Sequence, residues 1–263
     1  MEEPSKSIDL DASVTSLNER KGLARGVFLL PNLITTGALF SGFYAIIAAM
    51  TGSLESAAIA IVIAGFLDTL DGRIARMTNT QSEFGVQYDS LSDLVAFGVA
   101  PAVLMFSWGL SDLGKIGWMI AFLYMACAAL RLARFNTAPD THVFFGLASP
   151  MAAGTLAAFV WIWVDNFEPA VNLQFSVFLA AIVTVMAVLM VSNIRYYSPK
   201  SINLKGRVPF IYTLGIVLLF VVIAAYPPGV LLLLGIIYGF SGPVQALLRR
   251  GKSAAGGNEP EKS

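Results

Sequence analysis

Four aspartates lie at helical spacing in two consecutive segments of this 263-residue chain. Asp68 and Asp71 fall three positions apart, and Asp89 and Asp93 fall four positions apart, so each pair shares one face of a helix. The stretch between the pairs is short, which predicts antiparallel neighbouring helices whose acidic faces meet. Carboxylate oxygens without histidine or cysteine suit Mg²⁺, Mn²⁺ or Ca²⁺ rather than Zn²⁺. The spacing therefore predicts a site for one or two hard divalent cations.

Small residues and one arginine accompany the aspartates on the same two faces. Gly72 and Ala75 continue the first face, and Gly85 precedes Asp89 by one helical turn. Residues this small leave room for a ligand against the helix backbone, and Arg76 can bind a phosphate through two parallel hydrogen bonds. Helix caps and close packing could explain each residue alone, but not the combination. Because paired cations can hold a phosphoryl group during transfer, the pattern indicates a metal-bound phosphate site.

The composition predicts an all-α integral membrane protein. Hydrophobic residues make up 56% of the chain, charged residues 13%, and the mean hydropathy is +0.71. A net charge of zero indicates no nucleic-acid partner. A membrane-spanning helix needs about 20 apolar residues. Eight segments satisfy this requirement: 32–50, 54–77, 84–109, 114–137, 146–164, 173–192, 208–226 and 229–248.

The basic residues predict how these spans are oriented. If both termini are cytoplasmic, every lysine and arginine except Lys115 lies in an inner segment. The same orientation places the four aspartates at the cytoplasmic face of the cell (inner) membrane. The predicted spans divide the chain into four parts. These are a disordered N-terminal tail (1–27), a membrane core (28–207), two further C-terminal helices (208–248) and a disordered tail (249–263).

The eight residues of the acidic pattern form a signature at fixed spacing. Written out, it is D-x₂-D-G-x₂-A-R-x₈-G-x₃-D-x₃-D, and it begins at Asp68. This resembles the signature of the CDP-alcohol phosphotransferase family. The resemblance implies a core of six membrane helices, a homodimer, a metal site for two Mg²⁺ or Mn²⁺ ions, and a reaction that releases CMP.

The resemblance also implies roles for individual residues. Asp68, Asp71 and Asp89 would be metal ligands, and Asp93 would be a further ligand or the catalytic general base on the acceptor hydroxyl. The CDP group would be bound by Asp68, Gly72, Ala75, Arg76 and Gly85, with Asn32 orienting the diphosphate or the motif helices. A carboxylate surrounded by cations is a weak base, so acidification of the acceptor by the metal is an alternative to general-base catalysis.

Segments outside the signature narrow the resemblance further. They are PNLIT from Pro31, SLSDLVAFGVAPA from Ser90, RLARFN from Arg131, GLASP from Gly146 and VSNIRYYS from Val191. From about residue 28 to residue 210 the chain is similar to CDP-diacylglycerol–serine O-phosphatidyltransferases, the phosphatidylserine synthases. This implies that CDP-diacylglycerol and L-serine are the substrates, and phosphatidylserine and CMP the products. Glycerol 3-phosphate, inositol phosphate or choline would be alternative acceptors.

An acceptor with a carboxylate needs a basic pocket. The candidates are Arg131, Arg134 and Asn136 after the fourth span, and Asn193 and Arg195 after the sixth. Arginine favours carboxylates, although arginines in inner loops also serve only to orient the spans. A divalent-cation transporter is the alternative from another class of protein. It would place carboxylates deep in several spans, whereas here they gather at one membrane face.

Overall fold

A computed structural model describes residues 10–78, 80–137, 144–167, 172–196 and 225–255 of the chain. In these ranges the protein is helical, apart from one two-stranded ribbon and short turns. The elements in chain order are α1 (Leu10–Met50), α2 (Leu54–Met77), α3 (Glu83–Asp93), the π-helix η1 (Leu94–Val99), α4 (Ala100–Trp108), the 3₁₀ helix η2 (Leu110–Leu113), α5 (Lys115–Thr137), β1 (Phe144–Phe145), α6 (Ser149–Asn166), α7 (Leu173–Val191), β2 (Arg195–Tyr196) and α9 (Pro227–Ala255).

Most predicted spans correspond to helices of the structure. The third predicted span, 84–109, forms one apolar rod in which α3, η1 and α4 follow one another without a break, from Glu83 to Trp108. The spans predicted at 54–77, 114–137 and 173–192 agree with α2, α5 and α7 within about two residues, the usual uncertainty of a helix end. Most of the segment 208–226, the predicted seventh span, lies outside the described residues.

The two predicted tails are partly helical in the structure. α1 begins at Leu10, so residues 10–27 continue the first helix instead of forming the disordered segment expected there. α9 likewise runs to Ala255, beyond the expected end at residue 248. Both extensions contain alanine, lysine and arginine, which favour helix, and a helix already nucleated by a membrane span extends at little cost.

Five described helical segments are long and apolar enough to cross a membrane. They are Leu29–Met50, Glu83–Trp108, Lys115–Thr137, Leu173–Val191 and Pro227–Gln245. The helices α2 and α6 fall outside this set although they belong to the same bundle. The end of α2 carries the acidic motif, and α6 is rich in alanine and contains buried Ser149 and Thr155. The centre of the bundle thus uses small and polar residues for packing, and lipid-facing helices use large apolar ones.

Close contacts between small residues hold α1 against α2 and η1. The interface between α1 and α2 is lined with buried alanines, and Ser41 of α1 donates a hydrogen bond of 2.7 Å to the carbonyl of Ala60 in α2. A Cβ atom added to Gly42 would lie 2.7 Å from Cα of Ala96 in η1. Only glycine permits this approach, so the first helix is held directly against the motif helices.

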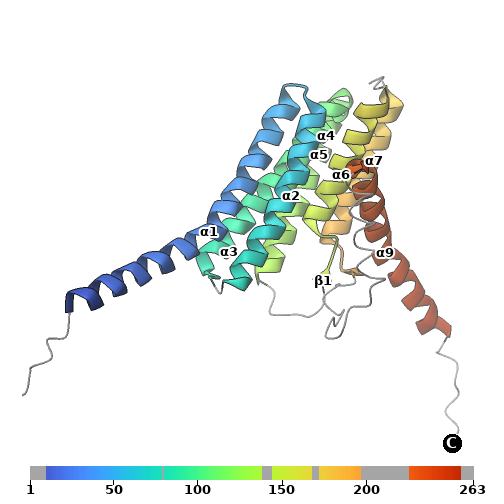
Figure 1. The fold of residues 1–263 in the computed structure, drawn as a ribbon. Coiled ribbons are helices and arrows are strands. Elements are labelled where there is room, and N and C mark those ends of the chain that lie inside the picture. Colours follow the sequence, from blue (N-terminus) through green and yellow to red (C-terminus); the bar gives the residue numbers. More distant parts are fainter. Residues whose placement is uncertain (1–9, 79, 138–143, 168–171, 197–224, 256–263) are drawn as a thin grey trace, which may run out of the picture.

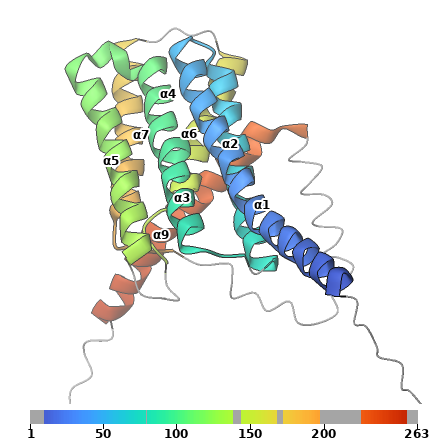
Figure 2. The same cartoon turned by 90° about the vertical axis from the view of Figure 1, so that its left-hand side faces the viewer.

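The ends of the helices define two poles of the bundle. The turns that follow α1 and α4 lie at one pole, and the turn that joins α2 to α3 lies at the other, together with β1 (Figure 1). The start of α1 and the end of α9 also lie at this second pole, and α1 projects away from the bundle there (Figures 1 and 2). The acidic motif therefore shares its pole with both ends of the described chain.

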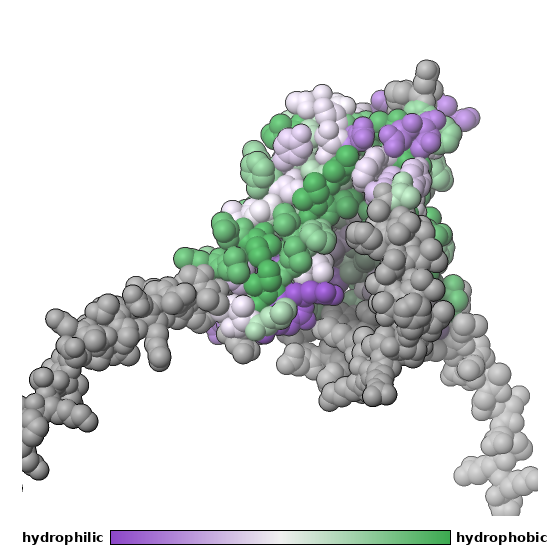
Figure 3. Space-filling view, in the orientation of Figure 1, coloured by the Kyte–Doolittle hydropathy of each residue, from purple (hydrophilic) through white to green (hydrophobic). Residues whose placement is uncertain are grey.

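The surface between the poles is apolar. Apolar side chains cover the lateral face of the bundle, and hydrophilic ones gather toward its upper and lower ends (Figure 3). Several large apolar side chains are more than two-fifths exposed, among them Phe40, Ile63, Phe66 and Phe122. Large exposed apolar residues around a well-packed core are typical of a protein that faces lipid. The structure is thus that of an integral membrane protein built from helices.

Candidate active site

Three aspartates from two helices converge at the pole described above. One carboxylate oxygen each from Asp68, Asp71 and Asp89 lies within 4.8 Å of the other two. Asp68 and Asp71 lie on α2 and Asp89 on α3, as the helical spacing predicted. Asp71 is buried, and the other two are partly buried. Three partly desolvated carboxylates at this separation repel one another strongly, so the arrangement favours a bound divalent cation.

Asp93 lies beside this trio. Its carboxyl group lies near that of Asp68, and it is close enough to interact electrostatically with Asp68, Asp71 and Asp89. Asp93 is the last residue of α3, one turn beyond Asp89, and it is partly buried. The fourth carboxylate thus lies at the edge of the trio, a position from which it could act as a ligand or on a substrate hydroxyl.

Thr35 of α1 fixes the buried carboxylate. Its hydroxyl lies 2.6 Å from Oδ2 of Asp71 and 3.0 Å from the carbonyl oxygen of Pro31. The carbonyl of Thr35 in turn accepts a hydrogen bond of 3.2 Å from the hydroxyl of Ser92. One residue of α1 therefore contacts both motif helices and orients the carboxylate of Asp71.

The start of α3 is set by a side-chain cap next to Asn32. Ser82 accepts a hydrogen bond of 3.0 Å from the backbone N–H of Gly85. A Cβ atom on Gly85 would lie 3.1 Å from Oγ of Ser82 and 3.4 Å from Oδ1 of Asn32. Gly85 thus leaves space that a larger residue would close, and Asn32 faces this space from α1. Gly85 and Asn32, both expected to contact the CDP group, are therefore neighbours.

Arg76 lies against the backbone of its own helix. Its Nε donates a hydrogen bond of 2.8 Å to the carbonyl of Gly72, and a Cβ atom on Gly72 would lie 3.8 Å from the Nη2 nitrogen of Arg76. The side chain is exposed, and Ala75 beside it is partly buried. A guanidinium held by one bond at Nε keeps its two terminal nitrogens for a phosphate.

A π-helix follows Asp93 directly. In η1 the N–H of Ala100 bonds to the carbonyl of Val95, five residues earlier. Tyr124 of α5 donates a hydrogen bond of 3.3 Å to the carbonyl of Phe97 in the same segment. Single turns of π-helix often accompany functional sites. Here the π-helix changes the rotational register between the polar and apolar parts of one span.

Arg131 is the predicted acceptor arginine that interacts with one of the aspartates. It lies on α5, and one terminal nitrogen donates a hydrogen bond of 3.1 Å to the hydroxyl of Ser149 on α6. Its charge interacts with Asp93 and with Tyr238 of α9. Its Nε atom is buried and has no hydrogen-bond partner in the described part of the chain. A partly buried cation with a spare donor next to Asp93 is a suitable receptor for an anionic group.

Arg134 and the backbone of Arg195 both lie next to Phe145 of the small ribbon. The guanidinium of Arg134 lies 5.4 Å from the centre of the Phe145 ring, a cation–π distance. Phe145 pairs through its backbone with Arg195, in the antiparallel ribbon of β1 and β2. The backbone of Arg195 is described, but its side chain lies outside the described residues. Phe145 thus contacts the side chain of Arg134 and the backbone of Arg195, and Arg134 is exposed whereas Arg131 is partly buried.

The two candidate asparagines differ in position. Asn136 donates a hydrogen bond of 2.9 Å to the hydroxyl of Ser90, which lies on α3 between Asp89 and Asp93. It therefore ties the end of α5 to the motif helix. Asn193 is exposed in the turn between α7 and β2, where Ile194 accepts a backbone bond of 2.9 Å from Gly146.

Several polar residues at the site were not predicted from the sequence. They are Thr35, Ser82, Ser90, Ser92, Ser149 and Tyr238. A polar residue inside an apolar span is the signal that could have pointed to Thr35 and Ser92, since such residues need a partner. Tyr238 offered no comparable signal, because tyrosine is common in membrane helices near the interface.

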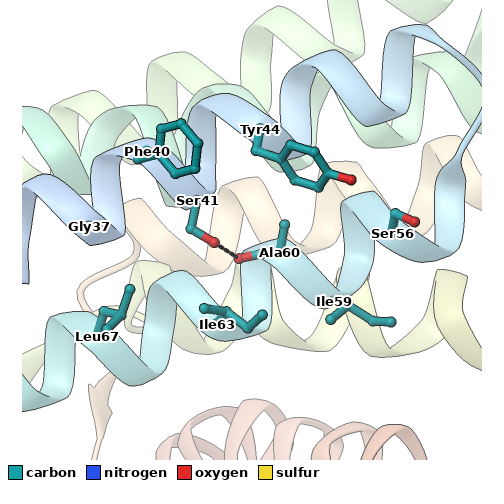
Figure 4. A pocket seen from close by; sticks show the side chains of 9 residues that line it. All are labelled: Gly37, Phe40, Ser41, Tyr44, Ser56, Ile59, Ala60, Ile63 and Leu67. Carbon is teal, nitrogen blue, oxygen red and sulfur yellow. Dashed lines mark hydrogen bonds between the residues drawn. The ribbon is translucent and has the colours of Figure 1, made fainter.

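An apolar pocket lies next to the acidic site on the membrane-facing side of α1 and α2. It has a volume of about 530 Å³, and Figure 4 shows its lining residues, Gly37, Phe40, Ser41 and Tyr44 from α1 and Ser56, Ile59, Ala60, Ile63 and Leu67 from α2. Leu67 directly precedes Asp68, and Gly37 lies two residues after Thr35. One end of the pocket is therefore adjacent to the aspartates.

Comparison with known proteins identifies the class to which this site belongs. The sequence model of the CDP-alcohol phosphatidyltransferase family matches residues 28–190. This range contains α2, α3 and all four aspartates, and it covers more than half of the chain. The chain belongs to the CDP-alcohol phosphatidyltransferase family and is a phospholipid-synthesis transferase of that class, which confirms the resemblance deduced from the acidic signature.

Individual relatives carry more specific names. A CDP-diacylglycerol–serine O-phosphatidyltransferase of Helicobacter pylori is 36% identical over 184 residues, 68% of this chain and 77% of the relative. An archaetidylserine synthase of Methanothermobacter thermautotrophicus is 36% identical over 170 residues, 64% of this chain and 69% of the relative. The CDP-diacylglycerol–serine O-phosphatidyltransferase of Bacillus subtilis is 39% identical over 124 residues, 47% of this chain and 70% of the relative.

Proposed function

We propose that this protein transfers the phosphatidyl group of CDP-diacylglycerol to the hydroxyl of L-serine and releases CMP. The observation that carries the proposal is the convergence of Asp68, Asp71 and Asp89, joined by Asp93, in a member of a phosphatidyltransferase family. The relatives named as serine phosphatidyltransferases, from bacteria and an archaeon, support serine as the acceptor.

The four aspartates fit a divalent metal site. They supply only hard oxygen donors, and one oxygen each of Asp68, Asp71 and Asp89 lies within 4.8 Å of the others. Mg²⁺ or Mn²⁺ suits such a donor set, and four carboxylates are enough for two ions. Bound ions would neutralise charge on the diphosphate and on the departing CMP. Thr35 would orient Asp71 as a ligand, in the way that neighbouring hydrogen bonds orient metal ligands generally.

Residues around the aspartates are suited to hold the CDP group. Gly72, Ala75 and Gly85 leave the helix surfaces open, and Arg76 offers its terminal nitrogens to a phosphate. Asn32 reaches the space beside Gly85 from α1. Phosphoryl transfer depends mainly on positioning and on charge neutralisation, which is what these residues would provide.

Asp93 is our candidate for the general base on the serine hydroxyl. It is the aspartate outside the trio whose oxygens lie within 4.8 Å of one another, and it lies on the side of Arg131. In this role its carboxylate takes the hydroxyl proton as the serine oxygen attacks phosphorus. If Asp93 is instead a metal ligand, the acceptor would lose its proton through acidification by the metal.

Arg131 is the best placed residue for the serine carboxylate. It is partly buried next to Asp93, so an acceptor bound to it would have its hydroxyl group close to the proposed base. Arg134, Asn136, Asn193 and Arg195 would form the entrance at the same pole. Serine carries one carboxylate and no phosphate, so it requires fewer cations than a phosphorylated acceptor.

The apolar pocket between α1 and α2 is a suitable position for an acyl chain of the donor. Its lining includes the exposed side chains of Phe40 and Ile63, and at one end Leu67 directly precedes Asp68. A donor with its diphosphate at the metal site could place a chain there without leaving the bilayer. The donor lipid would then enter the active site from the side of α1 and α2.

The finer topology belongs to the same proposal. We propose eight membrane spans, with both termini and the active site on the cytoplasmic side of the inner membrane, and a homodimer. The position of both ends of the described chain at the pole of the acidic motif supports an even number of spans (Figure 1). The distribution of lysine and arginine supports a cytoplasmic location for that pole.

CMP release by the detergent-purified protein tests the proposal. The protein is incubated with CDP-diacylglycerol and Mn²⁺ or Mg²⁺, and serine, glycerol 3-phosphate, inositol phosphate and choline are supplied in parallel. Release that depends on serine and yields phosphatidylserine is expected. Release with a different alcohol would refute serine as the acceptor and keep the family reaction, and transport of the cation without CMP release would refute the transferase.

A further inference from the structure

We propose that Tyr238 of α9 is a positioning residue of the acceptor pocket, which holds the guanidinium of Arg131 beside Asp93. The inference rests on the proposed function, because it concerns how the acceptor carboxylate is received. It also assigns a function to a helix that the family match does not include, since that match ends at residue 190 and α9 starts at Pro227.

The position of α9 is determined by a close contact with α6. A Cβ atom on Gly235 would overlap Oγ1 of Thr155 and would lie 2.9 Å from Cβ of the same threonine. Only glycine permits this approach, so the helices touch backbone to side chain at this point. Asn166, near the end of α6, also donates a hydrogen bond of 3.2 Å to the hydroxyl of Tyr226, which directly precedes α9. Two contacts therefore fix α9 along α6 (Figure 1).

Tyr238 lies one turn beyond Gly235, on the same side of α9. Its side chain is partly buried and packs against the hydrophobic core, whereas its neighbours Ile237 and Phe240 are exposed. The ring is thus directed into the bundle. The contacts of Tyr226 with Asn166 and of Gly235 with Thr155 run α9 antiparallel to α6. Tyr238 therefore lies toward Ser149, the hydrogen-bond partner of Arg131, and within electrostatic range of that guanidinium.

Arg131 needs such a partner. It is partly buried between α5 and α6, and the hydrogen bond from its Nη1 to Ser149 satisfies only one of its donors. A guanidinium carries five N–H donors, and a buried one is costly unless those donors are paired. The phenol oxygen of Tyr238 can accept a hydrogen bond without adding a negative charge. Ser149 and Tyr238 would then hold the cation from two helices and leave its remaining donors for a carboxylate.

This arrangement separates the two substrates. The aspartates, Arg76 and Asn32 lie on α1, α2 and α3, whereas Arg131, Ser149 and Tyr238 come from α5, α6 and α9. Removal of the Tyr238 hydroxyl should therefore weaken binding of the acceptor and leave binding of the CDP donor unchanged. A merely structural role for α9 would affect both substrates.

Steady-state kinetics of Tyr238→Phe in the full-length purified protein tests the inference. We expect the KM for serine to rise about tenfold, because one hydrogen bond to a charged group is lost. The kcat and the KM for CDP-diacylglycerol should stay within about twofold of their original values. Tyr226→Phe, which removes the hydroxyl bonded to Asn166 at the other end of α9, is the control for a general disturbance of this helix, and any effect it has should fall on both KM values alike. An unchanged serine KM, or an equal rise in both KM values, would overturn the inference.

A second comparison tests whether Tyr238 acts through Arg131. If it does, Tyr238→Phe should raise the serine KM much less in an Arg131→Lys background than in the original protein, since coupled residues are not additive. Additive effects would overturn the inference. Tyr238→His, which keeps a ring and a hydrogen-bonding group, should recover part of the lost affinity, and it replaces the phenylalanine variant if that variant does not fold.

Failure of the proposed function and failure of this inference give different results. If the original protein releases CMP with another alcohol and not with serine, the proposed acceptor is wrong, and the same variants are measured with that alcohol. A raised KM for that alcohol in Tyr238→Phe would then support the positioning role. The absence of CMP release with every alcohol would overturn both proposals.

Discussion

The hydroxyl oxygen of Thr35 lies 2.6 Å from Oδ2 of Asp71, and both side chains are buried. This contact joins α1 to the acidic face of α2 at the point where α3 also arrives, because Ser92 donates to the carbonyl of Thr35. A helix outside the acidic signature therefore determines the orientation of one of its carboxylates.

Thr35→Val should weaken metal binding without removing a metal ligand. The substitution keeps the shape of the side chain and deletes the hydroxyl, and partners of metal ligands typically contribute about 10- to 100-fold to metal affinity or activity. We expect the Mn²⁺ concentration for half-maximal CMP release to rise by about tenfold or more. Thr69→Val is the control, because Thr69 is exposed on α2 and bonds only to the carbonyl of Gly65. Equal metal dependence in both variants would refute the role of Thr35.

Asp93→Asn should abolish transfer and retain metal binding. A general base contributes about 10²- to 10⁴-fold to the rate, and Asp93 lies outside the trio of closest carboxylates. The variant should therefore lose CMP release by at least about 10²-fold, but Mn²⁺ should still raise its melting temperature. Asp89→Asn, which removes a member of the trio, should lose both the activity and the stabilisation by Mn²⁺. Loss of stabilisation in Asp93→Asn would assign Asp93 as a metal ligand instead.

Removal of divalent cations should both inactivate and destabilise the protein. The partly buried carboxylates of Asp68, Asp71 and Asp89 repel one another unless a cation is bound, and a ligand that binds only the folded state stabilises it. Excess EDTA should stop CMP release and lower the melting temperature, and Mg²⁺ or Mn²⁺ should restore both. Turnover that persists in excess chelator would rule out the metal site.

Filling the pocket between α1 and α2 should affect long-chain donors selectively. Ile63 lines this pocket and is 47% exposed. Ile63→Trp should raise the KM for a long-chain CDP-diacylglycerol, because the larger ring excludes an acyl chain, and should leave a short-chain donor unaffected. Val185→Trp, at an exposed position on α7 outside the pocket, is the control. The same KM for both donors in Ile63→Trp would place the acyl chains elsewhere.

The arginines at the end of α5 should differ in their effects. Arg131 interacts with Asp93, whereas Arg134 stacks on Phe145. Arg131→Gln should raise the serine KM by about 10-fold or more, the loss expected for a charge-assisted hydrogen bond. Arg134→Gln should also raise the serine KM more than the donor KM, but by a smaller factor. If Arg134→Gln raised both KM values equally, a structural role at the β1–β2 ribbon would be the better assignment.

The sequence alone determined the two helices of the acidic motif and the chemistry of their aspartates. Helical spacing predicted that Asp68 and Asp71 share one face and that Asp89 and Asp93 share another, and the short link between them made the two helices antiparallel neighbours. These are local properties, since they depend on a 3.6-residue period and on a turn too short to allow another arrangement. The same stretch contains the signature by which the family could be recognised.

Tertiary structure decided which distant residues join that face. Thr35, Ser149 and Tyr238 come from segments whose sequence carries no period or spacing relative to the aspartates, and packing of glycine and alanine brings their helices together. The three arginines looked equivalent in sequence, yet Arg131 lies near Asp93 and Arg134 lies over Phe145. The rotation of a helix about its axis depends on its neighbours, and a single span does not encode it.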